Sequence, residues 1–577
     1  MRHSSSRIIT GIFCPLFAVA AWVMAPHSPE TFSAEAQTAK PAIAAPGAAQ
    51  VQPASVSTAK TATEPKLVPA FGTEVYTAKR GEAIPTIARH YLGKTSYLTS
   101  SELAEAIRAV NHKSGSSNIL KTNEEIIIPG ILPAPISEKT IPISKDFEVR
   151  AIYLTGIMAA SDHGIRIIKH WREVGGNAVV FDIKDSDGSV NIPFEHPLLG
   201  EHKVYIHDVP KFVHFLHQQN MHAVARIAIF RDERLAVAHP ELAVQSRKNH
   251  TAWRENGKLV WTDPSNPKVQ DYDIALAKHV AQLGVDEIQF DYVRFPAEGD
   301  QKDAAFVFQN GQAPAQPEEQ DCSPAHVGTD AFVRPATAKP SETGTDVASA
   351  GTAAAPKGQK NVAHGASPGP AEKDGHKSRR DATNVACHVP RGPQRSDVIA
   401  AFLKKAYAEL HPTGVLLSLD VFGVMAWQRQ VDLSHTGQDI VQMARYCDVL
   451  SPMIYPSHFF GMDNIPHPGD EPAHFIGESM DRFMLITKGS GVVIRPWLQA
   501  FHWRTKTYSP EYIKIQVETA KAKGGIGFLF WNAANDYSKP YEAMPEMKSA
   551  NAKEKDKYFR GDELPAPTVQ AALTPAR

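Results

Sequence analysis

Cysteine is scarce in this sequence, charge is balanced, and only one long apolar run is present. Four cysteines among 577 residues exclude a fold built on a dense disulfide framework. The 61 Lys and Arg against 62 Asp and Glu leave a net charge of −1, which disfavours nucleic acid as a partner. No second run is as long as the apolar stretch from Ile8 to Ala25, so the sequence predicts one membrane anchor at most.

Several catalytic signatures are also absent. No Gly-x-Gly-x-x-Gly follows the first predicted barrel strand, which disfavours a dinucleotide cofactor. The 25 histidines include no His-Glu-x-x-His or comparable ligand spacing, and no Gly-x-Ser-x-Gly elbow occurs. We therefore expect no metal, no cofactor and no serine nucleophile. A metal-dependent deacetylase or esterase is an alternative that predicts chelator-sensitive activity.

The first 32 residues are typical of an export signal. Arg2 and Arg7 precede the apolar run, and Val23-Met24-Ala25 offers a small-residue cleavage site. The length of the run lies between that of a cleavable signal and that of a short anchor, so both outcomes stay open. Either one predicts an exported protein of the periplasm or cell envelope.

Composition divides the rest of the chain. Residues 33–70 form an Ala/Pro/Thr-rich linker, 71–132 a small domain, 148–545 a large α/β domain, and 546–577 a flexible tail.

An insertion interrupts the large domain. Residues 298–395 are rich in Pro, Ala, Gly, Lys and Asp, which predicts a mostly disordered segment. Cys322 and Cys387 lie toward its ends, where an oxidising compartment would permit a disulfide; two unpaired thiols are the alternative.

The small domain has the pattern of a βααβ unit. A β run at Val75-Tyr76-Thr77 and a turn at Lys79 to Glu82 precede two helices and a strand at Glu125 to Pro129. Its landmarks are Tyr76-Thr77-Ala78-Lys79-Arg80-Gly81-Glu82, Ile87-Ala88-Arg89-His90-Tyr91, Ile107-Arg108-Ala109-Val110-Asn111, Leu120 and Ile126-Ile127-Ile128-Pro129.

These landmarks resemble a LysM module. The resemblance implies binding of N-acetylglucosamine polymers, chiefly peptidoglycan. The segment Lys94 to Glu102 is longer than usual between the two helices and lies beside the expected sugar groove. A degenerate module that serves as a spacer or docking unit is therefore the alternative.

The large domain alternates apolar strand-like runs with amphipathic helices. The candidate helices include Gly164–Val174, Val209–Asn220, Pro267–Leu283, Asp397–Leu410 and Pro510–Lys523. Eight strand-like runs are expected at Arg150–Thr155, Ala178–Lys184, Ala223–Phe230, Glu287–Phe295, Val415–Phe422, Val449–Tyr455, Val493–Phe501 and Gly525–Trp531. This alternation predicts a parallel sheet, and the count of eight favours a closed (β/α)8 TIM barrel.

Strand parity places polar side chains on the inner face of this barrel. Asp291 and Asp420 fall on the neighbouring fourth and fifth strands, near the C-terminal ends where barrel enzymes hold their active sites. Their expected spacing of about 5 to 7 Å is that of a carboxylate pair that cleaves glycosidic bonds, with retention or inversion both open. We assign Asp291 as the nucleophile, kept ionised by Arg226 or Arg294, and Asp420 as the acid or base, although the sequence does not fix which carboxylate is the acid. A buried salt-bridged aspartate is the alternative for each.

Further side chains around the pair suit a sugar ligand, because aromatic faces stack on pyranoses and polar groups bind hydroxyls. For each aromatic residue the alternative role is packing in the core. For Asp182 and Lys184 the alternative is a structural ion pair with each other. The predicted substrate-binding residues are Asp182, Lys184, Arg226, Gln289, Arg294, Tyr455, Trp497, Gln499, Trp531 and Asn532.

The large domain also resembles the DUF4015 family of exported bacterial proteins. The resemblance rests on Val149-Arg150-Ala151-Ile152-Tyr153-Leu154-Thr155-Gly156, Phe181-Asp182-Ile183-Lys184-Asp185, Ala225-Arg226-Ile227, Trp261-Thr262-Asp263-Pro264, Asp286-Glu287-Ile288-Gln289-Phe290-Asp291-Tyr292-Val293-Arg294-Phe295-Pro296, Ser418-Leu419-Asp420-Val421-Phe422-Gly423, Ser451-Pro452-Met453-Ile454-Tyr455-Pro456 and Arg495-Pro496-Trp497-Leu498-Gln499. It implies a barrel related to the α-amylase-like glycosidases, which carry the nucleophile and the acid/base on strands four and five.

Together these features predict an exported glycoside hydrolase that acts on a polysaccharide of the envelope or the exterior, with a LysM module for cell-wall binding. The alternative is a non-catalytic glycan-binding scaffold of the envelope.

Overall fold

The computed structural model describes residues 70–113, 119–310 and 392–551, with side chains up to 545. The expected export signal, the linker, the Cys322–Cys387 pair and most of the tail lie outside the described residues. Within those residues no helix is both long and apolar enough to cross a bilayer.

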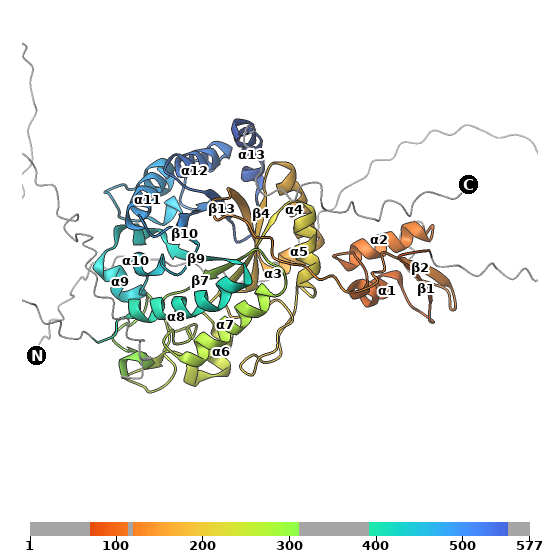
Figure 1. Cartoon of the computed structure of the whole chain (residues 1–577), viewed down its shortest axis with the longest axis horizontal. Helices are drawn as coiled ribbons and strands as arrows, with labels where there is room; N and C mark the ends of the chain where they lie inside the picture. The colour runs from red at the N-terminus through yellow and green to blue at the C-terminus, as the bar shows by residue number, and fades with distance from the viewer. Residues whose placement is uncertain (1–69, 114–118, 311–391, 552–577) are drawn as a thin grey trace, which may run out of the picture. The chain divides into compact units, whose positions relative to one another are not determined.

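The small N-terminal unit has the predicted βααβ order (orange in Figure 1). Strands β1 (Thr73–Thr77) and β2 (Glu125–Pro129) pair antiparallel, and helices α1 (Ile84–Tyr91) and α2 (Ser100–Val110) lie between them in sequence. A short 3-10 turn follows α1 at Leu92–Lys94. Ile87, Ala88 and Ile107 are buried in its core, whereas Val110 is only half-buried. Sugar binding by this unit stays a prediction.

The large domain is a closed barrel of eight parallel strands, which confirms the predicted fold (Figure 1). The strands pair in the order β3-β4-β5-β7-β9-β10-β12-β13, and β13 pairs with β3 to close the ring. Their bounds are β3 (Val149–Leu154), β4 (Ala178–Lys184), β5 (His222–Ala228), β7 (Glu287–Asp291), β9 (Leu416–Phe422), β10 (Val449–Ile454), β12 (Trp497–Gln499) and β13 (Gly527–Trp531).

The seventh predicted run is divided into two short strands. β11 (Val493–Ile494) pairs with the first half of β10, and β12 pairs with its second half. Pro496 lies in the gap, where it has no N–H to donate to the ladder.

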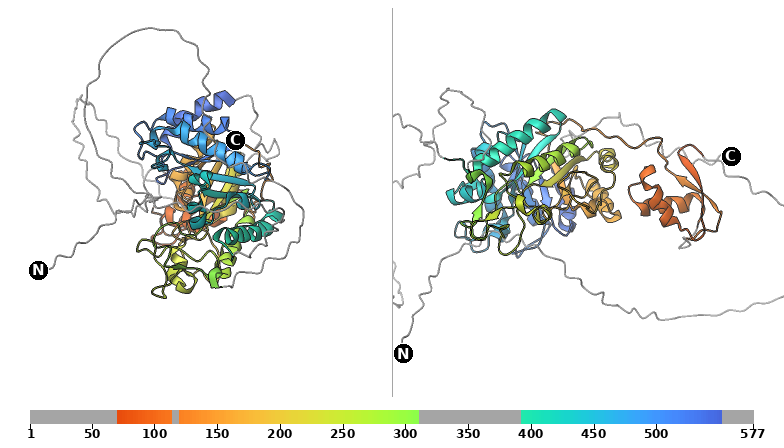
Figure 2. Two further views of the ribbon diagram at one scale, coloured as in Figure 1. Left: turned by 90° about the vertical axis from the view of Figure 1, so that its left-hand side faces the viewer. Right: turned by 90° about the horizontal axis from the view of Figure 1, so that it is seen from below.

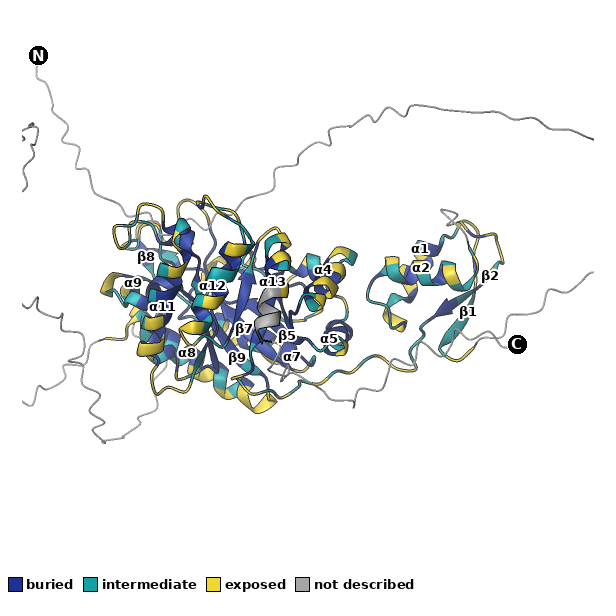
Figure 3. Ribbon diagram, turned by 90° about the horizontal axis from the view of Figure 1, so that it is seen from above, coloured by how far each residue is buried: buried dark blue, intermediate teal, exposed yellow. Residues whose placement is uncertain are grey.

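Helices surround the barrel, and their exposed faces point outward while the strands are buried (Figures 2 and 3). The long helices are α4 (Asp162–Glu173), α5 (Val209–Gln218), α7 (Pro267–Ala281), α8 (Arg395–Leu410), α11 (Pro472–Ile486), α12 (Pro510–Ala522) and α13 (Ser538–Asn551). Shorter elements are α3 (Gly156–Ala159), α6 (Glu233–Ala238), α9 (Gln430–Thr436), α10 (Ile440–Met443), β6 (Gln245–Ser246) and β8 (Ala304–Ala305).

The sequence fixes where several of these helices begin. The side chains of Asp208, Asn266 and Ser509 accept hydrogen bonds from the first-turn amides of α5, α7 and α12, and each helix has proline at its first or second position. An oxygen acceptor satisfies an amide that has no partner within the helix, and proline there has no amide to leave unsatisfied.

The predicted start of the insertion needs correction. Residues 298–310 are ordered, because β8 pairs with β6 and the rings of Phe306 and Phe308 pack on Phe295. The guanidinium of Arg395, the first residue of α8, lies over the rings of Phe295 and Phe306. Only residues 311–391 of the insertion lie outside the described part of the chain.

The connector to the barrel is held by an ionic network. The Glu138 carboxylate accepts from His214 Nδ1 at 2.7 Å and from the buried His217 Nδ1 at 2.9 Å. His217 Nε2 also reaches Asp286, at 3.0 Å. The two histidines lower the pKa of Glu138 against the opposing effect of its burial, and the hydrogen bonds to Asp286 and Glu138 outweigh burial in raising the pKa of His217.

Substituting Glu138→Gln is expected to cost about 1 to 2 kcal/mol of unfolding free energy. The Glu138 contribution is lost as pH falls below its unfolded pKa of about 4.5, and the His217 contribution is lost as pH rises beyond about 6.5. Urea unfolding between pH 4 and 8 should therefore show the largest cost between these limits. A cost that does not vary with pH would contradict the ionic account.

Candidate active site

The two predicted catalytic carboxylates lie on adjacent strands. β7 and β9 pair in the register Gln289 with Ser418 and Phe290 with Leu419, so Asp291 and Asp420 come next on each strand. Asp291 contacts Arg226 of β5, and Asp420 contacts Trp497 of β12. Both carboxylates therefore face the barrel interior at its C-terminal end.

Arg226 is shared by three carboxylates. Its Nε and Nη2 donate to Asp291 Oδ2 at 3.2 and 2.6 Å, and its Nη1 donates to Asp182 Oδ1 at 2.5 Å. Its Nε also lies 3.9 Å from Asp420 Oδ2. One cation thus faces three buried acids, so a net negative charge accumulates unless a proton is taken up.

The same contacts limit the spacing of the catalytic pair. Because Arg226 Nε is 3.2 Å from an Asp291 oxygen and 3.9 Å from an Asp420 oxygen, these oxygens are at most about 7 Å apart. Carboxyl groups about 5 Å apart retain anomeric configuration and those beyond about 6.5 Å invert it. The limit therefore agrees with a glycosidase pair and leaves both outcomes open.

Burial and charge separate the protonation states of these acids. Burial and the neighbouring negative charge of Asp291 raise the pKa of Asp420 well above its usual range, and Arg226 opposes this only in part. Burial also raises the pKa of Asp182 to about 7, again against Arg226. Asp420 is therefore suited to donate a proton, while Asp291 accepts two hydrogen bonds from the arginine.

Aromatic rings line one side of the barrel mouth. Tyr455 and Trp531 stack with ring centroids 5.8 Å apart, and Phe501 lies edge-on to both, at 5.6 Å and 5.4 Å. Trp531 and Phe501 are partly exposed, whereas Tyr455 is 8% exposed. Trp531 thus stays a predicted stacking platform, whereas the buried Tyr455 packs against its ring.

Lys184 does not lie among the site residues. A β-bulge after Asp182 pairs Lys184 with Ile227, whose side chain faces the helices. The Lys184 ammonium is buried between Asp232 and Asp273, at 2.8 Å from each. The predicted sugar contact and the alternative ion pair with Asp182 are both wrong.

Trp497 and Gln289 are covered by the barrel. Trp497 is 2% exposed and its indole N–H donates to Asp420 Oδ1 at 2.7 Å, so it positions a carboxylate instead of offering a face to sugar. Gln289 is fully buried one pleat below Asp291, and among the described residues its amide nitrogen donates to the Ser451 hydroxyl alone, at 3.4 Å.

The amides of Gln499 and Asn532 are already used by the backbone. Gln499 accepts from the Ser457 amide and donates to the Phe501 carbonyl, and it is fully buried. Asn532 donates to the Ala500 and Asp536 carbonyls. Both side chains fix the loops around the site, so the predicted hydroxyl contacts are not supported by this geometry.

Arg294 lies near Asp291 without pairing to it. Its guanidinium stacks over the rings of Trp261 and Phe422, 4.6 and 4.5 Å from their centroids, and donates to the Phe295 carbonyl. Of the two arginines predicted to keep Asp291 ionised, Arg226 is therefore the one in contact.

Comparison with known families agrees with this geometry. Residues 151–537 match the model of the family DUF4015, described as "Putative glycosyl hydrolase domain". The chain belongs to the DUF4015 family. The match covers the barrel from β3 to the residues just before α13, including Asp182, Arg226, Asp291 and Asp420.

Solved structures similar to this DUF4015 chain are distant or short. A hypothetical protein from Ruminiclostridium thermocellum is 38% identical, over 27% of this chain and 80% of that one, with a TM-score of 0.25. The PgaB (BpsB) glycoside hydrolase domain from Bordetella bronchiseptica is 11% identical, over 69% and 98%, with a TM-score of 0.42. The spore cortex-lytic enzyme SleL from Bacillus megaterium is 10% identical, over 82% and 85%, with a TM-score of 0.34. No curated protein matches the chain.

Two residues of the DUF4015 site were missed by the sequence reasoning. The Tyr153 hydroxyl donates to Asp182 Oδ2 at 2.5 Å, and applying the inward parity to the first strand would have found it. Tyr292 has φ 54°, and its amide donates to Asp291 Oδ1 at 2.6 Å. A left-handed tyrosine is strained, and strain of this kind gathers at functional sites, but no residue type in the sequence signals it.

Proposed function

We propose that this DUF4015 protein is an exported glycoside hydrolase that cleaves O-glycosidic bonds of a cell-envelope or extracellular polysaccharide with Asp291 and Asp420. The observation that carries the proposal is the shared contact of both carboxylates with Arg226 at the C-terminal end of the barrel. Two carboxylates in unequal protonation states at this spacing are what glycoside hydrolysis needs.

In the proposed reaction Asp420 is the general acid. Its proton passes to the glycosidic oxygen as the bond to the anomeric carbon breaks. Asp291, which accepts two hydrogen bonds from Arg226, bonds to the anomeric carbon or removes a proton from the attacking water. Burial and the charge of Asp291 raise the pKa of Asp420 and so favour its protonated form.

The N-terminal unit adds a second proposed role. The βααβ order and core support a LysM module that binds peptidoglycan or another N-acetylglucosamine polymer. Such a module would hold the barrel beside an insoluble substrate and raise the local glycan concentration. Binding of the intact chain to purified peptidoglycan tests this role separately from hydrolysis.

The test of the main proposal is the release of reducing ends from bacterial cell walls and extracellular polysaccharides by the intact chain. Cleavage of at least one glycan supports the enzyme. Binding without any cleavage would support a glycan-binding scaffold instead.

Substituting Trp497→Phe should move the alkaline limb of the pH–rate profile. The indole N–H donates to Asp420 and favours its ionised form, so its loss raises the pKa of Asp420 further. Since the acid acts while protonated, activity should persist to higher pH, with kcat lowered roughly tenfold by poorer positioning. Trp531→Phe is the matched control, because it should change KM and leave the limb in place. A limb that moves to lower pH in Trp497→Phe would contradict Asp420 as the acid.

A further inference from the structure

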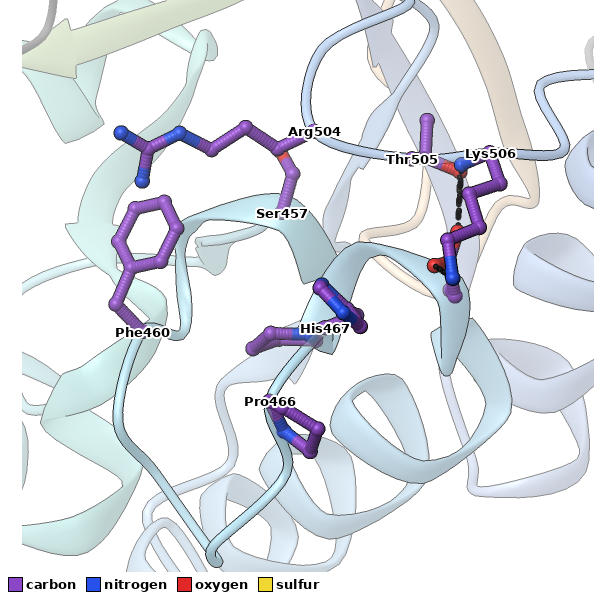
Figure 4. A pocket seen from close by; sticks show the side chains of 9 residues that line it. Ser457, Phe460, Pro466, His467, Arg504, Thr505 and Lys506 are labelled. Atoms are coloured by element: carbon purple, nitrogen blue, oxygen red, sulfur yellow. Dashed lines mark hydrogen bonds and ion pairs between the residues drawn. The ribbon is translucent and has the colours of Figure 1, made fainter.

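A cavity lies at the same end of the barrel as the carboxylates. Its volume is about 310 Å³, at the lower end for small-ligand sites. One wall comes from the loop after β10, with Phe460 and His467, and the other from the loop after β12, with Arg504 and Lys506 (Figure 4).

The cavity has an excess of positive charge. Arg504 and Lys506 are exposed at its rim, and Asp470 is the carboxylate among the residues that line it. Asp470 already accepts from the Lys506 amide at 2.6 Å and from the Thr505 hydroxyl at 3.3 Å. The Lys506 ammonium lies 4.0 Å from it, so this acid is shared between the backbone and one cation.

Arg504 has no acidic partner in the described part of the chain. Its guanidinium lies 3.9 Å from the centroid of the Phe460 ring (Figure 4). It also lies 4.6 Å from the centroid of the Trp503 ring. Stacking on rings leaves the in-plane N–H donors of a guanidinium available, and that fork matches the two oxygens of a carboxylate.

The loop is built to hold Arg504 in this position. Arg504 has φ 50°, a left-handed conformation that costs energy for a residue with a side chain. Its carbonyl oxygen packs against Gly469, where a Cβ would lie only 2.1 Å away. The two loops therefore pack closely at this residue, which holds the backbone of Arg504 in place.

Rings connect the cavity to the aromatic wall of the proposed active site. His458 lies 5.4 Å from Tyr455 and 4.8 Å from Trp503, and Trp503 lies 5.8 Å from Phe460. Burial and the positive charge of Arg504 lower the pKa of His458 to about 4, so this link is neutral near pH 7. A glycan could follow these rings from Trp531 toward Arg504.

We propose that this cavity is a subsite for the carboxylate of an acidic sugar, bound by Arg504 and Lys506 while the glycan extends to the catalytic pair. The inference rests on the proposed function, and it assigns the substrate to glycans that carry a carboxylate. That group can come from a uronic acid or from the lactyl ether of a muramic acid residue, since both present the same anion on a pyranose.

Binding of matched glycans to the full-length chain tests the subsite. The probes are a hyaluronan tetrasaccharide, which carries glucuronate, and a soluble muramic-acid-containing glycan strand, each beside its carboxyl-reduced form. Affinities are measured in 0.15 M NaCl for the wild type, the double variant Arg504→Gln/Lys506→Gln and Asp291→Asn. Lys488→Gln is the control, an exposed cation just after α11, at the opposite end of the barrel.

We expect at least one native probe to bind about tenfold or more tightly than its reduced form. This ratio should fall to near one in the double variant and persist in Asp291→Asn and Lys488→Gln. The probe that shows the ratio identifies the source of the carboxylate. A ratio near one for both probes in the wild type, or a ratio retained in the double variant, would overturn the subsite. If the subsite fails this test but the chain hydrolyses a neutral glycan, the proposed function stands without the subsite. If the native probe binds more tightly than its reduced form but no glycan is hydrolysed, the subsite stands and the proposed hydrolase activity is refuted.

Discussion

The Asp291→Asn variant is expected to lose hydrolysis by at least about a thousandfold while it remains folded. The amide keeps the shape of the carboxylate and can still accept from Arg226, so the hydrogen bonds seen at 2.6 and 3.2 Å have a substitute. What is lost is the negative charge that attacks the anomeric carbon or takes the proton from water.

A second effect should accompany this loss. The charge of Asp291 contributes to the raised pKa of Asp420, so the amide should bring the pKa of Asp420 down. Residual activity should therefore decline at lower pH than in the wild type.

The measurement is reducing-end release from a cleaved glycan, with glycan affinity and thermal unfolding recorded on the same samples. Asp271→Asn is the matched control, because this aspartate is exposed on α7 and pairs only with Lys405 among the described residues. An Asp291→Asn variant with the activity of the control would remove Asp291 from the reaction.

Substituting Arg495→Met is expected to cost about 3 to 5 kcal/mol of unfolding free energy. Arg495 and Glu287 are fully buried inside the barrel, and Nη1 of the arginine lies 3.0 and 2.8 Å from the two carboxylate oxygens. Removing the cation leaves a buried carboxylate with His222 at 3.0 Å as its remaining close basic partner.

This cost should depend on pH. Arg495 and His222 lower the pKa of Glu287 to about 2, against the effect of burial. A lowered folded-state pKa stabilises the fold above the unfolded value of about 4.5, and this contribution disappears as pH falls toward 2. The wild type and Arg495→Met should therefore differ most near pH 7 and progressively less below pH 4.5.

Urea unfolding of Arg495→Met, of Glu287→Gln/Arg495→Met and of Lys523→Met tests this account. The double variant should recover much of the loss, because no buried charge remains unpaired. Lys523→Met breaks a surface pair with Asp481 and should cost less than about 1 kcal/mol. A double variant as unstable as Arg495→Met would show that lost packing, and not unpaired charge, causes the effect.

The barrel could be predicted from the sequence because its strands are buried runs of apolar residues between helical segments. β4 and β5 are buried along their whole length, and each predicted run contains a strand. The rule that inward residues alternate also placed Asp291, Asp420 and Arg226 on one face.

Parity failed where the backbone departs from regular geometry. The bulge after Asp182 turns Lys184 toward the helices, and no residue in Phe181-Asp182-Ile183-Lys184 marks it. The depth of a side chain along the barrel also cannot be read from alternation. Gln289 shares the face of Asp291 but lies below it, and Trp497 faces inward but is covered.

Loop contacts were beyond the sequence for a related reason. Gln499 and Asn532 bind carbonyls and amides whose positions depend on how the chain folds after β12 and β13. The sequence does not show that these side-chain amides are already hydrogen-bonded to the backbone, so it predicted that they bind sugar hydroxyls.

One assay tests the catalytic pair most directly: reducing-end release by the intact chain, Asp291→Asn and Asp420→Asn on the same panel of cell-wall and extracellular polysaccharides. We predict that the wild type cleaves at least one glycan and that each single substitution abolishes this cleavage while glycan binding persists. Cleavage at the wild-type rate by each of the two single variants would contradict the assignment of these two acids.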